Sequence, residues 1–179
     1  FSRNYEEGIL TAYRDLPEAD VIIFNIGNRP AHWGDMPKKL GYLDLMHVAS
    51  WQISFKRESI VNNNVYFDEH MGAGSGNGAE EEFRFLTDCR KNGLAIYYVP
   101  FVIADVAQTK STWFKGYNEE FFINRGNTTR YIMGYVPAVL YAAYYSIRKR
   151  HQFDSDISWF KAFRLIMKGI HENRLGKKK

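Results

Sequence analysis

Three consecutive glutamates, Glu80, Glu81 and Glu82, are the residues of this chain best placed to do chemistry, because they stand where a glycine-rich loop opens into a helix. A carboxylate at the edge of a mobile loop can act as a general base and take the proton from a neutral hydroxyl. The structural alternative is that they start the helix well, since acidic side chains in a first turn are favoured by the exposed backbone N–H groups and the macrodipole. Both interpretations remain open.

The loop before them contains Gly74, Gly76 and Gly78, and with Ala79 it meets the loose pattern G-x-G-x-x-G/A of phosphate-binding turns. The charges argue against a phosphate, because it would meet three glutamates and no basic residue lies between Arg57 and Arg84. A general base therefore fits the charge better, and a nucleotide-binding loop is kept as a third possibility.

The surrounding pattern predicts strand, loop, helix and strand. The short β-type run Val65–Phe67 precedes the loop, the helix ends at Gly93 as a left-handed C-cap, and Leu94–Val99 with its extension to Ala104 forms the second strand. Further elements are expected in the order of the chain: a helix from the N-cap Asn4 to Pro17, a strand at Asp20–Ile26, a loop at Gly27–Pro37, a short helix at Leu40–Val48, a strand at Ser50–Lys56 and a helical turn at Arg57–Val61.

The continuous apolar run Asp20–Ile26 is typical of a strand buried on both faces, and it indicates the α/β class. The 45% hydrophobic content and the net charge of +4 are compatible with one domain that has a real core. The single cysteine, Cys89, rules out an internal disulfide, fits a reducing compartment, and is expected to be a buried thiol rather than a nucleophile.

The segment from Phe67 to Pro100, FDEHMGAGSGNGAEEEFRFLTDCRKNGLAIYYVP, resembles the C-terminal half of a family-2 glycosyltransferase domain of GT-A fold. The resemblance covers roughly residues 19–112 and implies a partial GT-A-like mixed sheet flanked by helices over residues 1–112. It implies that Glu82 is the catalytic base, with Glu81 as its neighbour. It also places Trp51 and Gln52 beside the acceptor, and Trp33 could stack on a sugar or pack on its own domain.

The family uses a nucleotide-sugar donor and a divalent metal, Mg²⁺ or Mn²⁺, which the resemblance implies for the complete enzyme. Asp105, in a loop where many members have a histidine, is the candidate ligand, and the alternative is that this loop has no metal role. Asp154–Asp156 spells D-x-D, but it follows the base instead of preceding it, so we interpret it as a helix cap. No N-terminal nucleotide-binding half is found and residue 1 is Phe1, so the chain is expected to be a fragment that binds donor poorly and turns over slowly.

Residues 113–179 are expected to form a helical, basic, aromatic-rich extension. The uncharged run Tyr131–Ile147 is at the short edge of the ~17 to 25 residues of a membrane-spanning helix and is interrupted by Gly134 and Pro137, so we expect either a buried core helix or an interfacial one. The last helix, predicted to begin near Asp154–Asp156, is basic and amphipathic and suits anionic lipid or its own domain.

The sequence thus predicts part of an inverting glycosyltransferase that acts on a saccharide or lipid-linked acceptor in bacterial surface polysaccharide synthesis. It would be cytoplasmic, and peripheral on the inner face of the cell membrane. The alternative is a non-catalytic α/β module that docks on a membrane or a partner subunit. Nucleic acid is not an expected partner, because the basic residues crowd one helical tail without a recognisable motif.

Overall fold

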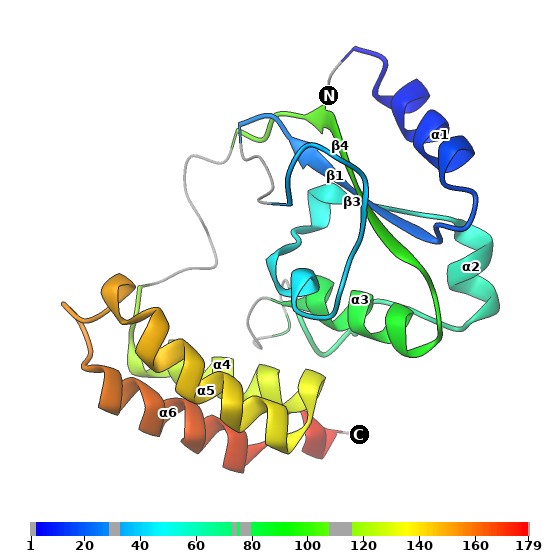
Figure 1. The fold of residues 1–179 in the computed structure, drawn as a ribbon. Coiled ribbons are helices and arrows are strands. Elements are labelled where there is room, and N and C mark those ends of the chain that lie inside the picture. Colours follow the sequence, from blue (N-terminus) through cyan, green and yellow to red (C-terminus); the bar gives the residue numbers. More distant parts are fainter. Residues whose placement is uncertain (1–2, 29–32, 73–74, 76–79, 108–115, 179) are drawn as a thin grey trace. The chain divides into compact units, whose positions relative to one another are not determined.

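The computed structural model describes residues 3–28, 33–72, 75, 80–107 and 116–178 (Figure 1). The chain divides into two compact units. One comprises Phe1–Asp68 and Glu81–Thr109 and is called the sheet unit; the other comprises Glu69–Glu80 and Lys110–Lys179 and is called the helical unit. The second unit thus contains the predicted helical extension together with a segment from the middle of the chain.

The sheet unit is built on a four-stranded mixed sheet, which confirms the predicted α/β class. Its strands lie in the order β2-β4-β1-β3, with β1 and β4 parallel and the other two pairs antiparallel. The bounds of the four strands are β1 Val21–Ile26, β2 Lys38–Lys39, β3 Ile53–Phe55 and β4 Ile96–Ala104.

The strand β1 is buried on both faces, as its continuous apolar run predicts. On one face Ile22, Phe24 and Ile26 form a core with the inner side of helix α1 (Tyr5–Asp15), which contributes Ile9 and Tyr13. The expected side-chain cap of this helix is wrong: Asn4 has a left-handed backbone with φ 66°, and its side chain makes no cap hydrogen bond.

Helix α3 (Glu81–Lys91) ends as predicted, at Gly93 with φ +80°. The N–H of Gly93 donates to the carbonyl of Arg90 at 3.1 Å, and the N–H of Leu94 donates to that of Cys89 at 3.1 Å, which is the paired pattern of a Schellman motif. The short helix α2 (Arg57–Asn62) also lies where a helical turn is expected.

Three predictions in the sheet unit are wrong or too long. Val65–Phe67 is not a strand, because the ring of Phe67 stacks on Phe85 of α3 at 4.3 Å instead of joining the sheet, and Tyr66 is 63% exposed. The strand expected at Ser50–Lys56 is only β3, preceded by a 3-10 turn η2 (Ser50–Gln52). The helix expected at Leu40–Val48 is the single turn η1 (Asp44–His47).

The helical unit contains α4 (Glu119–Met133), α5 (Tyr135–Arg148) and α6 (Trp159–Glu172), with the short turns η3 (Arg150–Gln152) and η4 (Gly176–Lys178). The uncharged run Tyr131–Ile147 is divided between α4 and α5 at Gly134, whose φ is +85°. In the described part of the chain, every helix falls short of the length and apolar character that crossing a membrane requires.

Helix α6 begins later than predicted. Its N-cap is Ser158, whose hydroxyl accepts from the N–H of Lys161 at 3.4 Å, whereas Asp154–Asp156 lies in the preceding turn and does not cap it. Helices α4 and α6 approach closely at two glycines: Gly126 of α4 faces the backbone of α6, and Gly169 of α6 faces the backbone of α4. These contacts close a core that contains the following buried residues: Phe122, Ala138, Ala142, Tyr145, Phe153, Ile157, Ala162, Ile166 and Ile170.

A mostly buried ion pair ties the segment Glu69–Glu80 to the helices of the same unit. The guanidinium of Arg125 lies 3.1 Å from the carboxylate of Glu80 and donates to the hydroxyl of Tyr141 at 2.6 Å. Burial alone would lower the pKa of Arg125, but the charge of Glu80 and the contact with Tyr141 raise it above its ordinary value. Arg125 is therefore a fixed cation.

Candidate active site

The carboxylate of Glu82 is joined to the turn before strand β3. Its Oε1 accepts a hydrogen bond from the backbone N–H of Ser50 at 3.2 Å, between residues 32 positions apart in the chain. The next residue in that turn is Trp51, which is 36% exposed. The structure thus brings the residue expected to be the base close to the turn that carries one expected acceptor contact.

The neighbouring carboxylate, Glu81, is half-buried at the start of α3. Partial burial raises the pKa of Glu81 above its ordinary value, and the negative charge of Glu82 raises it further. Residues three and seven positions along a helix share a face, so Glu81 lies on the side of α3 that carries Arg84 and Asp88. Glu82 lies about a quarter turn away, on the side of Ser50.

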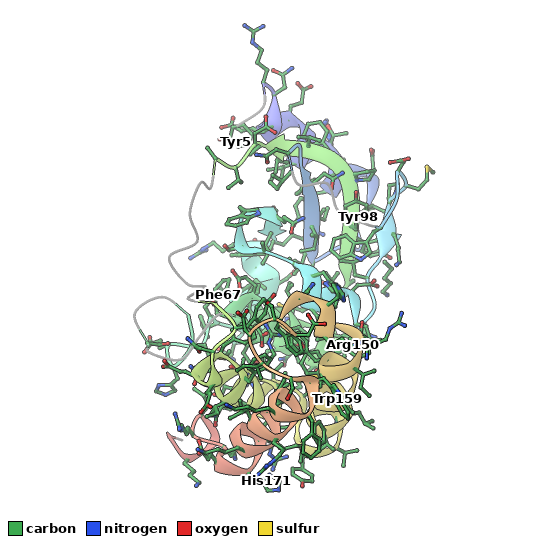
Figure 2. The ribbon with its side chains drawn as sticks, turned by 90° about the vertical axis from the view of Figure 1, so that its left-hand side faces the viewer. Tyr5, Phe67, Tyr98, Arg150, Trp159 and His171 are labelled. Carbon is green, nitrogen blue, oxygen red and sulfur yellow. The ribbon has the colours of Figure 1, made fainter. Side chains whose placement is uncertain are left out.

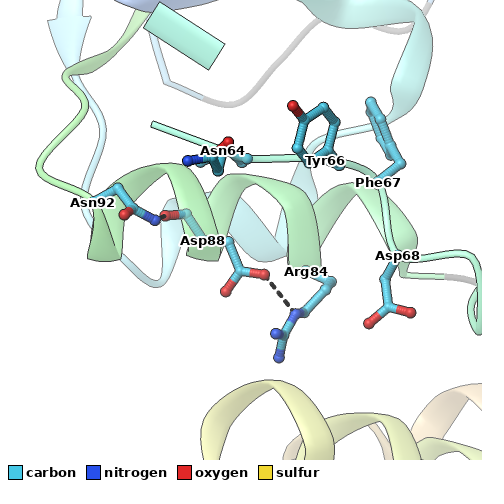
Figure 3. A pocket seen from close by; sticks show the side chains of 8 residues that line it. Asn64, Tyr66, Phe67, Asp68, Arg84, Asp88 and Asn92 are labelled. Carbon is cyan, nitrogen blue, oxygen red and sulfur yellow. Dashed lines mark hydrogen bonds and ion pairs between the residues drawn. The ribbon is translucent and has the colours of Figure 1, made fainter. Parts of the chain in front are cut away.

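The side of α3 that carries Arg84 and Asp88 borders an open groove of about 390 Å³, called the α3 groove, and neither Glu81 nor Glu82 is among its lining residues (Figure 3). Its floor contains an ion pair along the helix, in which Nε of Arg84 lies 2.7 Å from Oδ2 of Asp88. The opposite side of the groove is the extended segment that follows α2. The lining residues are Asn64, Val65, Tyr66, Phe67, Asp68, Arg84, Asp88 and Asn92.

The α3 groove offers planar polar groups and an aromatic ring. Asn64 and Asn92 contribute amides, of which that of Asn92 donates to the backbone carbonyl of Asp88 at 2.9 Å. Asp68 and Asp88 contribute carboxylates, and Tyr66 contributes a largely exposed ring. Its volume lies within the ~300 to 1,000 Å³ of small-molecule sites. Such a lining suits a neutral polyhydroxyl ligand, which has many hydroxyls and apolar C–H faces.

Two other expected acceptor contacts are engaged inside the sheet unit. The indole N–H of Trp33 donates to Asp44 at 3.0 Å, and its ring packs against Tyr98 at 5.2 Å. Gln52 is buried; its amide donates to the carbonyl of Phe24 at 3.1 Å and accepts from the N–H of Ala49 at 3.0 Å. Neither lines the α3 groove, and their roles as acceptor contacts stay predictions.

The candidate ligand Asp105 is exposed where strand β4 ends, and its carboxylate lies against Gly27 at the end of the parallel strand β1. Beside it the amide of Asn28 exchanges two hydrogen bonds with the backbone of Val106, at 2.9 and 3.1 Å. Within the described ranges, no group of three or more His, Cys, Asp or Glu side chains is arranged to hold a metal. The role of Asp105 as a metal ligand therefore stays a prediction.

No family model matches this chain. Comparisons with curated proteins and with solved structures find no match either.

Sequence reasoning did not find the residues of the α3 groove or the role of Ser50. One signal was present: Arg84 and Asp88 are four residues apart on a helix, a spacing that places opposite charges together on one face. No local signal joins Ser50 to Glu82. Gly74, Gly76 and Gly78 lie outside the described residues.

Proposed function

We propose that this chain is the acceptor-side part of an inverting glycosyltransferase of GT-A-like fold, which transfers a sugar from a nucleotide-sugar donor to a hydroxyl of a saccharide or lipid-linked acceptor. We place it in bacterial surface polysaccharide synthesis at the inner face of the cell membrane. The observation that carries the proposal is the hydrogen bond from Ser50 to Glu82, which holds the carboxylate beside the turn of Trp51. The mixed sheet and the motif Glu81–Leu86 support it.

In this proposal Glu82 takes the proton from the attacking acceptor hydroxyl. The hydroxyl oxygen forms a bond to the anomeric carbon from the side opposite the nucleoside diphosphate, which leaves with the electrons of the broken C–O bond. With Oε1 of Glu82 oriented by Ser50, the proton is assigned to Oε2. Glu81 accepts a hydrogen bond from a second acceptor hydroxyl, and the α3 groove receives the rest of the saccharide.

Among the residues that the structure describes, no partner for the donor's diphosphate is identified. When bound, a divalent metal would offset the charge that develops on that leaving group. Because the described residues do not form a ligand set for Mg²⁺ or Mn²⁺, we route no step through a metal. The proposal is restricted to acceptor binding and proton removal.

The test uses the full-length gene product with labelled nucleotide sugars and a glycan or lipid acceptor extract. Glu82→Gln should lower transfer by at least about a hundredfold, which is the lower end for loss of a general base. The matched control is Glu58→Gln, because Glu58 lies in the first turn of α2 in the same unit and should leave transfer unchanged.

Full activity in Glu82→Gln would contradict the proposal and favour the helix-start role of the glutamates. In that case the two substitutions should behave alike and change only the stability, by up to about 1 kcal/mol. A second candidate, a non-catalytic docking module, is favoured by a row of exposed apolar side chains on α5. It requires that no nucleotide sugar is turned over by the full-length product.

A further inference from the structure

The outward side of helix α5 carries four large apolar residues in one row. They are Val136, Leu140, Tyr144 and Ile147, and between 52% and 67% of each is exposed. Spacings of four, eight and eleven residues place them within roughly a quarter of the helix circumference. We call this row the α5 stripe.

The residues of the α5 stripe do not belong to the buried core of the helical unit. On the opposite side of α5, Ala138, Ala142 and Tyr145 are buried in the core of the helical unit. Single exposed apolar residues are normal on a protein surface, but a contiguous row marks an interaction site. The stripe therefore needs a partner with an apolar surface.

The net charge of the helical unit indicates the sign of the charge that the partner should carry. This unit has 14 lysine and arginine residues against 7 aspartate and glutamate residues, a net charge of +7, whereas the sheet unit has 10 against 13, a net charge of −3. Helix α5 itself contains no acidic residue, and it ends at Arg148, which is followed by Lys149 and Arg150. An anionic partner is complementary to this end of the helix.

The dimensions suit a helix that lies along a bilayer surface. From Val136 to Ile147 the stripe is about 16 Å long, too short to cross the hydrocarbon and sufficient to rest in the interface. Trp159 and Phe160 are exposed where α6 begins, at the same end of the unit as Arg150 (Figure 2). Tryptophan and tyrosine favour the headgroup level of membranes.

We propose that the α5 stripe docks in the plane of an anionic lipid bilayer. Val136, Leu140 and Ile147 enter the boundary between headgroups and acyl chains, Tyr144 lies at headgroup level, and Arg148 and Arg150 contact lipid phosphates. A bilayer of anionic lipids has an apolar interior beneath a negatively charged surface. The interior matches the apolar stripe, and the surface matches the basic residues at its end. This docking does not depend on the proposed transfer reaction.

The test is flotation of the full chain with vesicles of phosphatidylcholine alone or mixed with phosphatidylglycerol. The chain should float with the anionic vesicles, weakly or not at all with the neutral ones, and less at about 1 M salt, where charges are screened beyond about 3 Å. Leu140→Ser with Ile147→Ser should weaken anionic binding at least tenfold. Arg148→Gln with Arg150→Gln should weaken it about fivefold per residue.

The matched control is Leu10→Ser, because Leu10 is 64% exposed on α1 of the sheet unit and should not change flotation. All substituted residues are exposed, and circular dichroism checks that the variants fold. Equal binding to neutral vesicles, or unchanged binding of the Leu140/Ile147 variant, would overturn the proposal. Stripe-dependent self-association without flotation would also overturn it and assign the stripe to a second copy of the chain.

Discussion

Helices α4 and α6 pack backbone against backbone at two glycines, so an alanine at either position should destabilise the helical unit. Gly126 of α4 and Gly169 of α6 lie where the two helices cross. A Cβ atom at Gly169 would collide with the backbone carbonyl oxygen of Ile123, and one at Gly126 would collide with that of Ile166. A backbone carbonyl cannot rotate away as a side chain can, so the helices would have to separate.

Two opposing terms set the magnitude for Gly169→Ala. Alanine in a helix interior is favoured over glycine by about 1 kcal/mol. Overpacking a fixed interface costs about 1 to 3 kcal/mol, and the backbone collision at this site places it at the upper end. We therefore expect a net loss of about 1 to 2 kcal/mol in the free energy of unfolding, which lowers the melting temperature of a chain of this length by roughly 2 to 8 °C.

The assay is urea denaturation followed by circular dichroism, on both single variants and the double variant. One separation of the helices accommodates both methyl groups, so Gly126→Ala and Gly169→Ala should cost less together than the sum of their separate costs. An increase of about 1 kcal/mol in Gly169→Ala, the value that helix propensity alone gives, would refute the close crossing.

Three further predictions concern buried or half-buried polar groups. Arg125→Met should destabilise the helical unit by about 3 kcal/mol in urea denaturation, because it removes the cation from Glu80. Adding Glu80→Gln should restore part of this loss, and equal stability of the single and the double variant would contradict the pairing. Burial raises the pKa of the Cys89 thiol to about 12, so it should stay unreactive toward a thiol reagent at pH 8 until the sheet unit unfolds, and fast labelling of the native chain would contradict this. Because folding raises the pKa of Glu81, its charged form destabilises the fold; Glu81→Gln should therefore stabilise the sheet unit at pH 7, and the gain should disappear below the ordinary pKa of a glutamate, as pH-dependent urea midpoints would test.

Elements with strong local signals could be predicted from the sequence. The apolar run of β1 correctly predicts that the strand is buried on both faces, and Gly93 correctly predicts the end of α3, because both features depend on neighbouring residues. One error arose where a distant contact decides the local structure: Phe67 belongs to a β-type run but stacks on Phe85 of α3. The cap of α6 is a local error, because Ser158 and not the acidic turn at Asp154–Asp156 accepts from the N–H of Lys161.

The candidate site was predictable only in part for the same reason. The glutamates stand out by their position after a glycine loop, but only Glu81 and Glu82 lie in the first turn of α3, because Glu80 precedes the helix with a φ of 92°. The hydrogen bond between Ser50 and Glu82 and the ion pair between Glu80 and Arg125 join residues 32 and 45 positions apart, and no spacing rule predicts such pairs. The α3 groove likewise depends on Asn64–Asp68 lying along the helix, which follows from tertiary packing.

The assignment of Glu69–Glu80 to the helical unit has a consequence for synthesis on the ribosome. The chain passes from one unit to the other after Asp68, after Glu80 and after Thr109. Every residue of the sheet unit has been made once Thr109 is added, but the helices that Glu69–Glu80 packs with come later. At ~5 to 20 residues per second their synthesis takes roughly 4 to 14 s. During that interval every residue of the sheet unit is available for folding, whereas the helices of the other unit, including Arg125, the partner of Glu80, are still to be made.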